Sequence, residues 1–164
     1  MRQASGLPGS LHRSTRFAAL LLALVFCSHA HASATFDTTL PDEQTLSQLE
    51  QRAQQAHPRE QCFLYTELVH VMTEIAGKEM LDGNVEQASA MLKRVERYAQ
   101  LIHLGLANDT KRLKNAEQLM QHTTYRLNGL LRAASSDDRE TLKSTLKQLD
   151  QVQDELLTQV FKHN

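Results

Sequence analysis

Apolar residues recur every three or four positions along most of this chain, and that period limits its folding more than any other feature. In the last segment the spacing alternates between four and three, with Gln153 as the polar exception, over Leu142, Leu146, Leu149, Leu156 and Val160. Such spacing places an apolar seam along one face of an α-helix. The sequence shows none of the two-residue alternation that forms a half-buried strand. We therefore predict an all-α fold, an antiparallel helical bundle of four to five helices.

Turn-forming residues divide this helical pattern at three places: His57-Pro58, Asp82-Gly83-Asn84 and Ser135-Ser136-Asp137-Asp138. At the second place, glycine enters the left-handed conformation freely and asparagine is a good N-cap, so we expect Gly83 to end one helix and Asn84 to cap the next. At the third, Asp137 and Glu140 have the spacing of a capping box. These signals predict short connections between antiparallel helices.

Residues 85–134 carry the helical pattern almost without interruption, and two interpretations of them stay open. One is a single helix of about 50 residues, roughly 75 Å long at 1.5 Å per residue. The other is a break or sharp kink near residues 105–110, where Gly105, Asn108 and Asp109 are compatible with a turn. We favour the break, because it lets the two halves fold back into a compact bundle.

The N-terminal region has the three parts of a secretory signal peptide. Arg2, Arg13 and Arg16 form a basic region, residues 17–27 are apolar, and Ala30 and Ala32 precede a cleavage position at Ser33. Eleven apolar residues fall short of the about 20 that span a bilayer, although a short membrane-tethering helix remains the alternative. The prediction is a cleaved signal peptide over 1–32, a flexible lead-in over 33–41 and a helical bundle domain over 42–164.

Export and charge together limit the partners of this protein. Removing 32 of the 164 residues leaves 132, with 15 basic and 19 acidic side chains and a formal charge of −4. That balance argues against binding to nucleic acid or to an anionic membrane surface. We expect an exported protein, periplasmic or extracellular, with no membrane span in the mature chain and no nucleic-acid partner.

Cleavage would also leave Cys62 as the one cysteine, so the mature chain has no internal disulfide. Cysteine is among the residues most often buried, and we expect a small apolar core residue here. The alternative is an intermolecular disulfide, because Cys62 lies near a helix start, where a thiolate is stabilised.

The mature chain keeps five histidines, which raises the question of a metal site. His70 and Glu74 share a helical surface with Glu67, and His103 lies at the edge of the next apolar stripe. Histidine and carboxylate side chains at helical spacing are the usual way to build a metal site in a bundle. A helical projection, however, turns His70 away from the apolar face toward water. We predict no metal site, and His70, Glu74 and His103 remain the candidates if one exists.

No catalytic motif is present, whether a nucleophile elbow, a zinc-protease motif or a phosphate loop. The sequence also lacks the motif for covalent haem attachment. A noncovalent haem between Met72 and His103 is conceivable, but any methionine-rich bundle would allow it. We predict a protein that is not an enzyme and has no cofactor.

One stretch of the chain shows the residue pattern of a known repeat. Large, small and glycine positions follow the expected order at Met72, Ile75, Ala76, Gly83, Ala88, Leu92 and Val95. Residues 69–95 therefore resemble a tetratricopeptide hairpin. Glu79 stands where the pattern has an aromatic residue, no proline follows at the expected end, and no second copy occurs. Because such arrays need about three units to bury their faces, the resemblance implies an adaptor role only if neighbouring helices continue the array.

Three functions follow from these observations. The first is an exported, non-enzymatic helical domain that acts through protein–protein contacts or through self-association along its leucine seams. The second is a metal- or haem-binding periplasmic bundle. The third is a tetratricopeptide-like adaptor.

Overall fold

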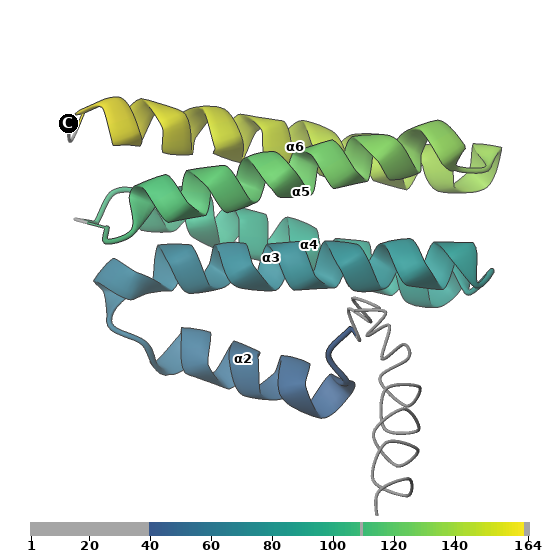
Figure 1. Cartoon of the computed structure of the whole chain (residues 1–164), viewed down its shortest axis with the longest axis horizontal. Helices are drawn as coiled ribbons and strands as arrows, with labels where there is room; N and C mark the ends of the chain where they lie inside the picture. The colour runs from purple at the N-terminus through teal and green to yellow at the C-terminus, as the bar shows by residue number, and fades with distance from the viewer. Residues whose placement is uncertain (1–39, 109, 163–164) are drawn as a thin grey trace, which may run out of the picture. The chain divides into compact units, whose positions relative to one another are not determined.

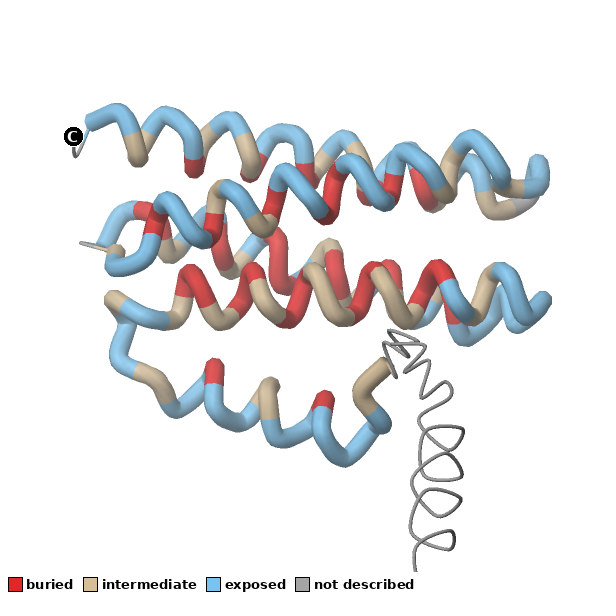
Figure 2. The backbone as a smooth tube through the Cα atoms, in the orientation of Figure 1, coloured by how far each residue is buried: buried red, intermediate tan, exposed pale blue. Residues whose placement is uncertain are grey.

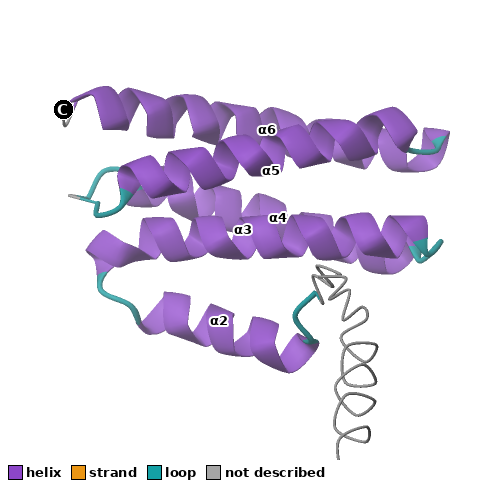
Figure 3. Ribbon diagram, in the orientation of Figure 1, coloured by secondary structure: helices purple, strands orange, loops and turns teal. Residues whose placement is uncertain are grey.

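The computed structural model describes residues 40–108 and 110–162, and within them the fold is all-α. Figure 1 shows five helices: α2 (Glu43–Gln55), α3 (Pro58–Leu81), α4 (Val85–Gly105), α5 (Leu113–Ala133) and α6 (Ser136–Lys162). Figure 3 shows the short loops that join them. The helical bundle is confirmed. The predicted signal peptide, its cleavage position at Ser33 and the lead-in as far as residue 39 lie outside the described residues.

The helices form two antiparallel hairpins stacked on each other, with α2 against the first (Figure 1). One hairpin is α3–α4 and the other is α5–α6. They pack with α3 beside α5 and α4 beside α6, so that α4 and α5 occupy opposite corners of a four-helix bundle. Because α4 leads directly into α5, the connection between them has to cross the bundle diagonally. Within the described ranges, no helix is both long and apolar enough to cross a membrane.

Residues 85–134 form two helices, so the break favoured near residues 105–110 is present. The connection docks on the first turn of α3, where the Lys111 amide donates to the Arg59 carbonyl oxygen at 2.7 Å. The guanidinium of Arg112 lies 3.4 Å from the centroid of the Phe63 ring, a cation–π contact. Arg112 has φ 61°, the left-handed conformation, just before α5 begins. Both helices turn their apolar stripes toward one core.

That core runs between all four bundle helices (Figure 2). Its largest fully buried side chains are Leu68 and Met72 of α3, Leu92, Tyr98 and Ile102 of α4, Met120 and Leu127 of α5, and Leu142, Leu149 and Leu156 of α6. Thr66, Thr73 and Thr145 are buried, and each donates to the carbonyl oxygen four residues earlier. In the described residues, every buried side-chain nitrogen and oxygen has a hydrogen-bond partner.

Two capping predictions need correction. Gly83 has the expected left-handed φ of 82°, but the side chain of Asn84 makes no capping hydrogen bond and donates instead to Glu79 Oε2 at 2.7 Å. Helix α6 already begins at Ser136, so the reciprocal contact forms two residues earlier than the predicted pair of Asp137 and Glu140. Ser135 Oγ accepts from the Asp138 amide at 3.4 Å and donates to Asp138 Oδ2 at 2.7 Å. A serine hydroxyl can accept and donate at once, whereas a carboxylate only accepts.

Helix α2 is held to the first hairpin by few apolar side chains and several polar ones. Leu46 and Ala53 are buried. The Tyr98 hydroxyl donates to Glu50 Oε1 at 2.7 Å, and Arg94 lies 3.0 Å from the same oxygen. Burial alone would raise the pKa of Glu50, but the hydrogen bonds from Tyr98 and Arg94 outweigh it and lower the pKa. These contacts tie α2 to α4 as well as to α3.

Candidate functional site

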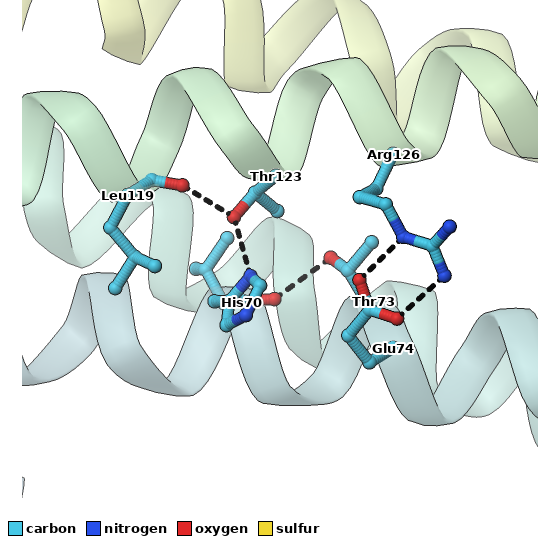
Figure 4. Close-up of polar contacts among 7 residues, drawn as sticks. His70, Thr73, Glu74, Leu119, Thr123 and Arg126 are labelled. Carbon is cyan, nitrogen blue, oxygen red and sulfur yellow. Dashed lines mark hydrogen bonds and ion pairs between the residues drawn. The ribbon is translucent and has the colours of Figure 1, made fainter. Parts of the chain in front are cut away.

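A cluster of polar side chains joins two helices where α3 and α5 run side by side. Helix α3 contributes His70 and Glu74, and α5 contributes His122 and Arg126. Each pair is four residues apart, so its members lie on the same side of their helix, one turn apart. Figure 4 shows His70, Glu74 and Arg126 between the two ribbons. We call these four residues the α3–α5 cluster.

His70 is half-buried in this cluster, which corrects the expectation that it points to water. Its Nδ1 lies 3.0 Å from Thr123 Oγ1. The Thr123 hydroxyl donates to the Leu119 carbonyl oxygen at 2.8 Å (Figure 4). With the Thr123 proton on that carbonyl oxygen, Nδ1 of His70 is assigned as the donor to Thr123. The helical projection failed because it tested His70 against the apolar stripe of α3 alone, while α5 covers this side with a threonine.

Glu74 and Arg126 form a two-pronged ion pair beside this histidine. Nε and Nη2 of Arg126 lie 2.8 Å from the two carboxylate oxygens of Glu74. This fork geometry is the strongest form of a charged hydrogen bond. Hydrogen bonding to Arg126 therefore lowers the pKa of Glu74. The carboxylate is occupied by a cation and is not free to bind a metal ion.

His122 completes the cluster at its exposed edge. The ring centroids of His70 and His122 lie 5.3 Å apart with an angle of 59° between the ring planes. Burial lowers the pKa of His70, Glu74 raises it, and His122 and Arg126 add smaller lowering effects. The net direction is downward, so near neutral pH His70 is held as the uncharged imidazole.

Of the three candidates named from the sequence, the structure brings together only His70 and Glu74. His103 lies on α4 and contacts α6, with Nδ1 2.6 Å from Glu155 Oε2. No group of three or more histidine, cysteine, aspartate or glutamate side chains among the described residues is arranged to hold a metal ion. His122 is exposed and was not among the candidates named from the sequence, although the spacing of His122 and Arg126 repeats that of His70 and Glu74.

The two residues considered for haem lie in different surroundings. Met72 is fully buried in the core of the bundle. The side chain of His103 is 50% exposed and faces Glu155. A haem between them would have to displace core packing on one side and an ion pair on the other.

Cys62 is buried, with 1% of its surface exposed. The expectation that the helix start stabilises its thiolate is wrong in direction, since burial raises the pKa of the thiol to about 12. An intermolecular disulfide would require the sulfur to leave this position.

Comparisons with protein families, with curated proteins and with solved structures found no match.

Proposed function

We propose that this protein is an exported, non-enzymatic helical adaptor that works through protein–protein contacts on the face formed by α3 and α5. The observation that carries the proposal is the stacking of two helix hairpins with α3 beside α5 and α4 beside α6. In many helical repeat proteins each repeat is a helix hairpin. The hairpins stack, and their aligned helices form extended binding faces. A binding face built this way needs no catalytic group.

The first hairpin gives some support to the tetratricopeptide resemblance. Gly83 lies at the turn with positive φ. Met72, Ala76, Ala88, Leu92 and Val95 are buried, and Ile75 is partly buried. The second hairpin supplies a neighbouring unit that the sequence pattern does not reveal. This arrangement supports the adaptor role.

Self-association along the leucine seams receives less support. In α6 the seam residues Leu142, Leu149 and Leu156 are fully buried in the bundle of their own chain. They are unavailable to a second copy unless the bundle opens. A contact with a partner therefore has to use the outer surface.

The outer surface of α5 offers suitable side chains. Tyr125 is 71% exposed and adjoins Arg126 in the sequence. Tyrosine and arginine are enriched at protein interfaces, because they combine apolar area with polar ends. We expect Tyr125 to contact the partner.

Site-specific crosslinking tests this proposal. A photo-crosslinking amino acid is placed at Tyr125, and in a matched variant at Lys143, an exposed position on α6. We expect one protein adduct from position 125, formed in the compartment where the protein resides, and none from position 143. Equal adducts from both positions, or none from either together with a strict monomer in light scattering, would overturn the proposal.

Export is tested separately by mass spectrometry of the N-terminus of the protein recovered from its own cells. The expected first residue is Ser33. An intact N-terminus on protein recovered from the cytosol would contradict export.

A further inference from the structure

We propose that His70 and His122 form a zinc-binding site that joins α3 to α5. The site uses two imidazole ligands from the protein and leaves the other positions of the ion to water or to another ligand. This inference does not depend on the proposed adaptor role. It rests on the separation of the two rings, on the fixed orientation of one of them and on the charge around them.

The separation of the rings matches that of two imidazoles on one tetrahedral ion. With zinc–nitrogen bonds of about 2.0–2.1 Å and about 1.1 Å from nitrogen to ring centre, two such rings have centres about 5.1 Å apart. A right-angle arrangement, as in square-planar coordination, gives only about 4.5 Å by the same bond lengths. The observed 5.3 Å is close to the tetrahedral value, so the two rings lie within reach of one ion.

The orientation of His70 is already that of a metal ligand. Its Nδ1 donates to Thr123 Oγ1, and the Thr123 hydroxyl is held in turn by the Leu119 carbonyl oxygen. Histidines that bind metals almost always donate their second ring nitrogen in this way, which fixes the tautomer and the ring. Nε2 of His70 therefore carries the lone pair. His122, on the exposed side, is free to turn its ring toward the same point.

The surrounding charge permits a divalent cation. Metal binds the uncharged imidazole, the form in which Nε2 of His70 carries a lone pair. Arg126 is the nearest cation, and Glu74 neutralises it through two hydrogen bonds. Since Glu74 is thereby occupied, the site has only two protein ligands, in agreement with the absence of any larger ligand group among the described residues.

Zinc titration of the full, untagged chain tests the site, with zinc chloride as the probe and calorimetry as the readout. We expect one Zn²⁺ per chain. His122→Ala should weaken binding at least tenfold, and because His122 is exposed this variant should keep the helical circular dichroism of the parent. The matched controls are His57→Ala and His103→Ala, which should bind zinc as the parent does.

Nitrogen chemical shifts of the histidine rings give a second readout. On adding zinc, Nε2 of His70 should shift while Nδ1 keeps its proton. Absence of binding, retention of full affinity in His122→Ala, or an equal loss in His103→Ala would each overturn the proposal.

Discussion

The imidazole of His70 loses much of its contact with water and gains one acceptor, Thr123, when the chain folds. Since burial penalises the charged ring most, the folded pKa falls below the value of 6.5 for an unperturbed histidine. Between the folded pKa and 6.5 the unfolded chain binds more protons than the folded one. The stability that comes from the neutral ring is therefore complete above about pH 6.5 and is lost as the pH falls toward the folded pKa. Glu74, His122 and Arg126 are the charged or titratable groups that face this ring.

The first prediction concerns this pH dependence. We expect the free energy of unfolding to fall between pH 7 and pH 5 in the parent protein and to fall less steeply in His70→Asn. The asparagine amide takes the place of Nδ1 and keeps the donor to Thr123, but it does not titrate. Urea unfolding at closely spaced pH values, with a chelator present, measures the slope.

The loss of stability that Glu74 causes at lower pH serves as the internal control. The pKa of Glu74 is lowered by Arg126 from 4.5, so the contribution of this ion pair is present above about pH 4.5 and is lost below it. The parent and His70→Asn should both lose stability in this way below about pH 4.5. Identical slopes for parent and variant between pH 7 and pH 5 would contradict the account of His70.

Periodicity predicted the helices themselves, because a stripe of apolar residues at a 3.6-residue period has to be buried whichever neighbour covers it. The turn at Gly83 followed from the one residue type that adopts positive φ without strain. The helix pairs could not be predicted in the same way, since an apolar stripe does not specify the helix that packs on it. For that reason His70 was assigned to solvent, and His122 was not named as its neighbour.

Gly77 shows the same limit of sequence reasoning in the packing of α3 on α5. In a helix interior, glycine normally costs stability relative to alanine. Here a Cβ atom would lie 2.9 Å from Leu130 Cδ1 and 3.2 Å from Leu130 Cδ2. The glycine lets α3 and α5 approach closely next to the α3–α5 cluster.

The second prediction compares one substitution at two helical glycines. Gly77→Val should lower the free energy of unfolding by about 1–3 kcal/mol, because the added side chain displaces the Leu130 side chain from its packing. Gly129→Val is the matched control, since a Cβ there meets nothing within 4 Å. It should change stability by less than about 0.5 kcal/mol. Thermal unfolding of both variants decides the matter, and equal losses would show that α3 and α5 do not pack closely at Gly77.

Both hairpins contribute to a single core. Leu68 and Met72 of α3 belong to the same buried cluster as Leu127 of α5 and Leu149 of α6. In long repeat arrays each unit contacts only its neighbours, and units can unfold separately. With only two hairpins, each supplies half of one interior. The stacking that supports an adaptor face therefore also makes the two hairpins depend on each other for stability.

The last prediction tests this dependence with Leu149→Ala. Leu149 is fully buried, so we expect a loss of about 2–5 kcal/mol from the removed side chain and the cavity that remains. If the hairpins share one core, hydrogen exchange should quicken by the same factor in α3 and α4 as in α5 and α6. Lys147→Ala, an exposed substitution two residues away in the same helix, should leave exchange unchanged. Faster exchange confined to residues 113–162 would mean instead that α3 and α4 remain folded without their neighbours, and that the two hairpins are separate units of an array.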